Sequence, residues 1–115
     1  MKVVISQSMY FPWVGMLEQI RLADVFIHYD DVQFSKGSFS NRVQVKTSSD
    51  KCWMTVPLSD HRLGQSIDEV RIKPGSAWRD RHLALLAQSF NGAPHAETAL
   101  ELAASVMDGD HRTVA

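Results

Sequence analysis

The feature that most restricts the fold is a strand–helix–strand pattern in residues 1–29. Apolar residues at the start predict a short buried strand over residues 3–6. Residues 25–29 form a second run of β-branched and aromatic side chains, which is typical of a strand. Between them, Pro12 suits the first turn of a helix, and apolar side chains then recur at helical spacing at Trp13, Met16, Leu17 and Ile20. This order favours a Rossmann-like βαβ unit with parallel strands and a right-handed crossover.

The rest of the chain is expected to form a hairpin, one more strand and two helices. Residues 41–47 alternate between polar and apolar side chains, and residues 52–56 return as a second strand of an antiparallel hairpin. Alternation over residues 67–72 predicts a further strand. Helical spacing predicts helices from Ser76 to about Phe90 and over residues 96–107, with a frayed end at residues 108–115. The fold class is therefore α/β, in a single domain spanning residues 1–115.

Composition and charge exclude several classes of function. The 12 basic and 13 acidic residues give a net charge of -1, so nothing favours nucleic acid, whose phosphates select basic surfaces. No apolar run is long enough to span a bilayer, which argues against membrane insertion. The first residues do not read as a signal peptide, and a cytoplasmic location is expected. Cys52 is the single cysteine, so neither an internal disulfide nor a cysteine-based zinc site is expected.

The strand-to-helix junction, residues 7–15, is the first candidate site. Ligands of parallel α/β sheets bind at the carboxyl ends of the strands, and the N-terminus of the following helix favours anions. Gln7 and Tyr10 are predicted to contact a substrate, and Trp13 offers stacking surface. Core packing is an equally good interpretation of Trp13. A distant resemblance to Rossmann-like nucleotidyltransferases rests on Pro12 and Gly15, but both histidines of their loop are absent.

Three further groups of residues are candidates for chemistry. Asp30 and Asp31 follow the second strand and are predicted as a general base, as ligands of a metal ion or as acceptors for sugar hydroxyls, although a solvated turn is the more common role of such residues. Asn41 and Arg42 begin a strand and are predicted to hold an anionic group, although an arginine on an exposed sheet face is more usual. His82 is a catalytic candidate on a mostly apolar helix, where a hydrogen-bonded histidine at the edge of the core is the commoner finding.

Several segments together resemble the WbqC-like family, which is associated with bacterial surface-polysaccharide biosynthesis. The family pattern of Gln-Pro-x-Tyr-Phe-Pro-Trp-x-Gly corresponds to residues 7–15, and its Asp-Asp-Val-Gln-Phe segment corresponds to residues 30–34. Lys36, Asn41 and Arg42 match a Lys-x-x-aromatic-x-Asn-Arg segment, and residues 53–57 match Trp-x-Thr-Val-Pro. A helical Trp-Arg-x-x-His segment matches Trp78, Arg79 and His82. Ser8 and Met16 depart from the family, which has proline and an aromatic residue there.

The resemblance implies a transferase that acts on activated sugars or glycan precursors, with aminoacyl or acyl transfer to an amino sugar as one role. It also implies that the chain resembles the N-terminal half of a family about twice as long. The resemblance further implies that the matched residues Gln33 and Lys36 bind the substrate. The expected partner is a nucleotide sugar or glycan precursor, while the cofactor and any homo-oligomer are left undetermined. The alternatives are a non-catalytic binding or assembly module and, second, a nucleotidyltransferase-like protein.

Overall fold

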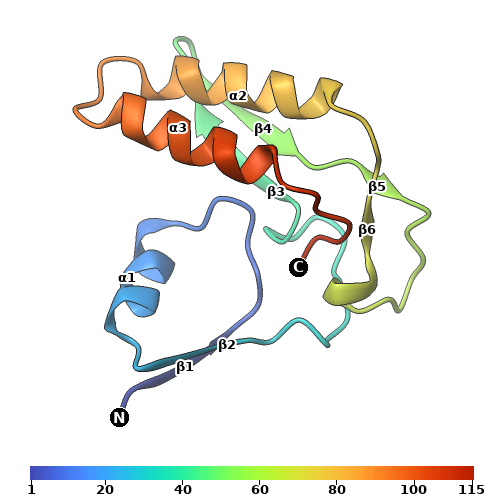
Figure 1. Cartoon of the computed structure of the whole chain (residues 1–115). Coiled ribbons are helices and arrows are strands. Elements are labelled where there is room, and N and C mark those ends of the chain that lie inside the picture. The colour runs from blue at the N-terminus through green and yellow to red at the C-terminus, as the bar shows by residue number, and fades with distance from the viewer.

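Three separate two-stranded sheets and three α-helices form the framework of the chain. A computed structural model describes all residues from Met1 to Ala115 (Figure 1). In chain order the elements are β1 (Val3–Ser6), α1 (Val14–Leu22), β2 (Val25–His28), β3 (Arg42–Lys46), β4 (Lys51–Thr55), β5 (Leu58–Ser59), the 3-10 helix η1 (Ile67–Glu69), β6 (Arg71–Ile72), α2 (Ala77–Phe90) and α3 (Ala96–Met107). The α/β fold class is confirmed. No helix is long and apolar enough to cross a membrane.

The predicted βαβ unit is confirmed, because β1 and β2 pair in parallel with Val3 opposite Val25 and Ile5 opposite Ile27. The expectation that the first strand is buried is wrong. Val3 is 47% and Ile5 60% exposed. Figure 1 shows α1 on one side of the two strands and no element on the other, so the side chains on that second face have nothing to pack against.

The main core lies between the hairpin and the two C-terminal helices. β3 and β4 pair antiparallel, as predicted, and Val43 lies opposite Met54. Met54 is fully buried and packs in one cluster with Leu86 of α2 and Ala103 of α3. Tyr10 and other half-buried apolar side chains surround this cluster. The hairpin and both helices therefore form one hydrophobic unit, to which the loop between β1 and α1 is attached.

The predicted strand over residues 67–72 is wrong over most of its length. Residues Ile67–Glu69 form the 3-10 helix η1, and only Arg71–Ile72 pair with β5. The amide of Ser66 donates to Oε2 of Glu69, and the amide of Glu69 donates to the carbonyl of Ser66, which closes a turn. Ile67 and Val70, three residues apart, both become buried against Phe34. Spacing by three suits a helical turn, whereas alternation by two does not.

The C-terminal segment is also more ordered than the sequence predicts. The amide of Val114 donates to the carbonyl of Val70, and the amide of Ile72 donates to the carbonyl of Arg112. Val114 also packs against the cluster of Phe34, Ile67 and Val70. The expectation of a frayed end at residues 108–115 is therefore wrong. These hydrogen bonds bring the chain beyond α3 back beside β6.

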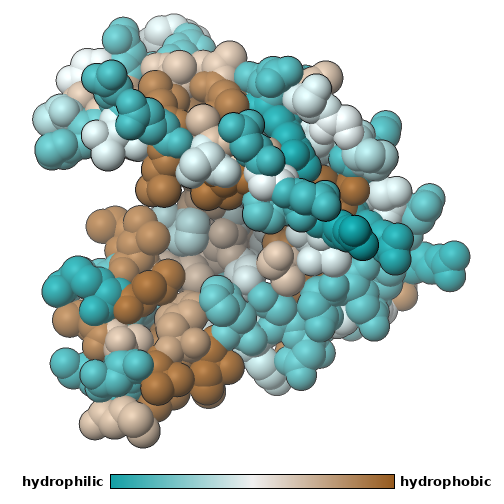
Figure 2. Space-filling view, in the orientation of Figure 1, coloured by the Kyte–Doolittle hydropathy of each residue, from teal (hydrophilic) through white to brown (hydrophobic).

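A hollow separates the βαβ unit from the layer formed by α2, α3 and the hairpin. Figure 2 shows it as a deep notch whose two walls carry apolar side chains. It has a volume of about 1110 Å³, and most of the residues that line it are apolar. The opposing walls include the loop from Met9 to Trp13 on one side and residues 99–106 of α3 on the other.

Candidate functional site

Asp30 fixes the position of the loop between β1 and α1. Its Oδ1 accepts the amide of Ser8 at 2.8 Å, and its Oδ2 accepts the hydroxyl of Ser8 at 2.5 Å. Asp30 is buried, and its own carbonyl accepts the amide of Asp68. A second hydrogen bond ties the loop to the segment before β3, because the amide of Tyr10 donates to the carbonyl of Phe39. The two carboxylate oxygens of Asp30 are thus both engaged in positioning the loop.

The same loop carries the phenol of Tyr10 to the imidazole of His82 on α2. The Tyr10 hydroxyl lies 2.7 Å from Nδ1 of His82, although 72 residues separate the two in the chain. The edge of Trp78 packs against the imidazole, with ring centroids 5.2 Å apart. Tyr10 and His82 were predicted for different tasks, substrate binding and catalysis. The structure brings them together as one hydrogen-bonded pair.

Burial keeps this pair uncharged. Burial raises the pKa of Tyr10 well above its ordinary value of 10.0, and the positive charge of Arg79 opposes this only in part. Burial, with help from Arg81, lowers the pKa of His82, while a hydrogen bond with the backbone of Thr55 opposes that shift. At neutral pH the pair is therefore a phenol and a neutral imidazole. One hydrogen bond joins the Tyr10 hydroxyl and Nδ1 of His82.

The lowered pKa of His82 predicts a loss of stability in mild acid. The unfolded imidazole takes up a proton near pH 6.5, whereas the folded one resists protonation, so the unfolded state binds more protons below that pH. The free energy of unfolding should therefore fall as pH decreases from 6.5 to the lower folded pKa. Urea unfolding of the wild type and of His82→Gln at a series of pH values below 6.5 measures this fall in the free energy of unfolding. An equally steep pH dependence in the variant would contradict the assignment to His82.

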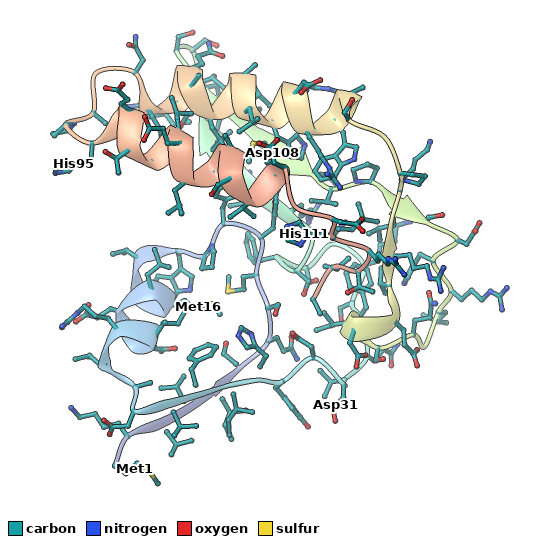
Figure 3. The ribbon with its side chains drawn as sticks, in the orientation of Figure 1. Met1, Met16, Asp31, His95, Asp108 and His111 are labelled. Atoms are coloured by element: carbon teal, nitrogen blue, oxygen red, sulfur yellow. The ribbon has the colours of Figure 1, made fainter.

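A cavity of about 220 Å³ lies beside Tyr10, between the start of α2 and the segment that follows α3. Its polar lining includes Ser40, Trp78, Arg79 and His111, among mostly apolar residues. Figure 3 shows His111 in the segment that follows α3, on the side of the hairpin and the β5–β6 pair. The cavity is thus built from the β1–α1 loop, the segment before β3, α2 and the C-terminal segment.

Arg79 supplies an uncompensated positive charge to this cavity. Its Nη1 donates to the carbonyls of Met107 and Gly109 at 2.9 and 3.3 Å, where the C-terminus of α3 favours a cation. Its Nε is buried without a hydrogen-bond partner, as is Nε1 of Trp78. The one ion pair of the structure joins Arg21 to Glu18, so no carboxylate neutralises Arg79. Buried donors without an acceptor are costly, and both residues that carry them line the cavity.

Asn41 and Arg42 are occupied by contacts within the fold. Nδ2 of the buried Asn41 donates to the backbone carbonyl of Val56. The backbone carbonyl of Asn41 accepts the amide of Val56. Nε and Nη2 of Arg42 donate to the carbonyl of Gly37 at 3.1 and 2.7 Å. The guanidinium also lies over the ring of Trp53, 4.0 Å from its centroid. The structure therefore places both residues where they hold the start of β3 to its neighbours.

The other predicted site residues lie on the surface and outside the cavity. They are Gln7, Trp13, Asp31, Gln33 and Lys36, all of them exposed. Gln33 forms an isolated β-bridge with Ser66. No group of three His, Cys, Asp or Glu side chains is arranged to hold a metal ion. Of the predicted residues, Tyr10 lines the cavity, and His82 lies behind this wall against Tyr10 and Trp78.

Sequence reasoning missed Trp78 and Arg79 as site residues. Both belong to the Trp-Arg-x-x-His segment, and that match was the available signal. Trp78 falls on an apolar stripe of α2, which favoured a role in the core. The partners of Arg79 are backbone carbonyls at the end of α3, and a carbonyl carries no residue-specific signal in a sequence.

One family model and one curated relative match the chain. The model of the WbqC-like protein family matches residues 7–115. A relative from Mycobacterium tuberculosis (strain ATCC 25618 / H37Rv), named Uncharacterized protein Rv1507c, is 39% identical over 112 residues. The match covers 96% of this chain and 48% of that protein, so the chain spans about half the length of its curated relative. No solved structure matches the chain.

Proposed function

Because the chain belongs to the WbqC-like protein family, we propose that it contributes the anion-binding part of a cytoplasmic transferase that acts on activated sugars or glycan precursors in surface-polysaccharide biosynthesis. The observation that carries the proposal is the unpartnered Nε of Arg79, buried beside the unpartnered Nε1 of Trp78. Activated sugars and many glycan precursors carry phosphate or carboxylate groups. Arginine binds either group with directed, charge-assisted hydrogen bonds.

The size of the cavity limits what this chain holds by itself. Pockets for whole small molecules usually measure about 300–1,000 Å³, and the cavity of about 220 Å³ is smaller. It accommodates one phosphate or carboxylate group, while the remainder of an activated sugar would extend beyond it. This agrees with a chain that spans about half of its relative. Aminoacyl or acyl transfer to an amino sugar is one form of the proposed reaction.

The proposal gives the named residues distinct roles. Arg79 and Trp78 hold the anionic group, and Tyr10 lines the same cavity. His82 is a positioning residue, since its Nδ1 fixes the Tyr10 hydroxyl. Asp30 positions the loop that carries Tyr10. Asp31, whose side chain is exposed at the end of β2, is the carboxylate that remains free to act as a base.

The test is a binding measurement on the purified chain with UDP-glucose, ATP, acetyl-CoA and inorganic phosphate, each with and without magnesium. We expect a phosphate-containing ligand to raise the melting temperature. Arg79→Gln should weaken that binding by about 10- to 150-fold, because a hydrogen bond to a charged group contributes about 1.5–3 kcal/mol. Isothermal titration of folded protein separates lost affinity from lost stability.

Arg81→Gln is the matched control, because Arg81 lies on the same helix with an exposed side chain. It should bind as the wild type does. Arg79→Lys keeps the charge but not the planar fork, and we expect intermediate affinity. Equal affinity of Arg79→Gln and the wild type, or no response to any ligand, would contradict an anion site at Arg79.

A further inference from the structure

The two walls of the hollow described above form an apolar groove that nothing in the chain fills. On the βαβ side, Trp13 is 61% and Leu17 52% exposed. On the side of α3, Leu102 is 67% and Val106 52% exposed. Large apolar patches of this kind mark contact surfaces for another protein, a membrane or a ligand. Figure 2 shows both walls facing each other across open space.

A second apolar surface lies on the face of β1 and β2 that no element covers. Val3, Ile5, Val25 and Ile27 share this face, since Val3 pairs with Val25 and Ile5 with Ile27. All four side chains are more than 40% exposed. Parallel sheets occur almost only with both faces covered, and a sheet of two strands is not stable by itself. The four side chains of this bare sheet face are therefore of the type that is normally buried under a second layer.

The total surface area indicates how large the covering element must be. The accessible surface is 7993 Å², whereas a compact monomer of 12.9 kDa exposes about 6,300 Å². The radius of gyration of 14.9 Å likewise exceeds the value of about 13 Å for a compact chain of this length. The excess of about 1,700 Å² on one partner corresponds to the larger, obligate class of interface. A short peptide would leave most of it exposed.

We propose that the apolar groove and the bare sheet face are an interface for a polypeptide segment equivalent to the part of the Mycobacterium tuberculosis relative that this chain does not match. That part is slightly more than half of the relative, about as long as this chain, and therefore large enough to cover both surfaces. Its contribution is a helix on the bare sheet face and apolar side chains in the groove. The interface adjoins the anion site, because Met9, Tyr10 and Val106 line both hollows, but it does not depend on the proposed function.

The test is co-expression of the full 115-residue chain with a tagged segment of the Mycobacterium tuberculosis relative, taken from outside the matched region. We expect a one-to-one complex by size-exclusion chromatography with light scattering. Amide hydrogen exchange in β1, β2, α1 and α3 should slow in the complex. Leu102→Glu in the groove and Ile5→Glu on the bare sheet face should each weaken the complex by about tenfold or more.

Leu63→Glu is the control, because Leu63 is 93% exposed and lies outside both surfaces. It should leave the complex unchanged. Absence of a complex on co-expression overturns the assignment of this occupant. A dimer of the chain alone, with slow amide exchange over the same segments, would show that a second copy covers these surfaces. This outcome also overturns the assignment of the occupant. A monomer whose β1, α1 and β2 amides already exchange slowly shows that these surfaces need no cover.

Discussion

Met54→Ala is expected to lower the free energy of unfolding by about 2–5 kcal/mol, the largest stability effect of any substitution considered. Met54 is fully buried in β4 and packs against Leu86 and Ala103, so one side chain joins the hairpin to α2 and α3. Truncation removes the hydrophobic transfer free energy of the deleted atoms. It also leaves a cavity between β4, α2 and α3. Urea denaturation followed by circular dichroism measures the change.

Leu63→Ala provides the comparison for the same experiment. Leu63 is 93% exposed, and its truncation should change the free energy of unfolding by no more than about 0.5 kcal/mol. Equal, small effects of the two substitutions would contradict the placement of the core between the hairpin and the C-terminal helices.

The second large effect is expected for Asp30→Ala, at about 1.5–3 kcal/mol in the free energy of unfolding. The substitution removes the acceptor of both hydrogen bonds from Ser8 and frees the loop that brings Tyr10 to His82. Binding at the Arg79 cavity should weaken with it, because Tyr10 forms part of the wall. Urea denaturation gives the stability, and titration of the folded variant gives the affinity.

A double-mutant cycle with Ser8→Ala isolates the side-chain part of this contact, since Ser8→Ala removes the hydroxyl and keeps the amide. Asp31→Ala is the matched control, because Asp31 is adjacent and exposed. It should alter stability by no more than about 0.5 kcal/mol. Additive effects of the Asp30 and Ser8 substitutions would show that the Ser8 hydroxyl does not interact with Asp30.

Features of the fold that depend on local pattern could be predicted from the sequence. The parallel pair of β1 and β2, the hairpin and the helices α2 and α3 all follow from the periodicity of their own residues. The failures concern context. Burial of β1 was inferred from its composition, but burial requires a partner layer, and none of this chain lies there. At residues 66–70, alternation and three-residue spacing coexist, and the Ser66–Glu69 hydrogen bonds select the turn.

The candidate site was less predictable, because its contacts join distant segments. Tyr10 and His82 were both singled out, yet no local pattern indicates a hydrogen bond between residues 72 positions apart. Arg42 was favoured over Arg79 for holding an anion because it follows a polar loop. Arg42 instead donates to the carbonyl of Gly37 and stacks on Trp53. Which arginine retains free donors is decided by tertiary packing.

The return of residues 112–114 beside β6 also determines when the cluster of Phe34, Ile67 and Val70 can close. A ribosome releases the chain from its N-terminus, so Phe34, Ile67 and Val70 emerge well before Val114, which packs against them. Translation delivers about 5–20 residues per second, so these side chains stay exposed to solvent for seconds in the nascent chain. This cluster therefore closes only after Val114 has left the ribosome.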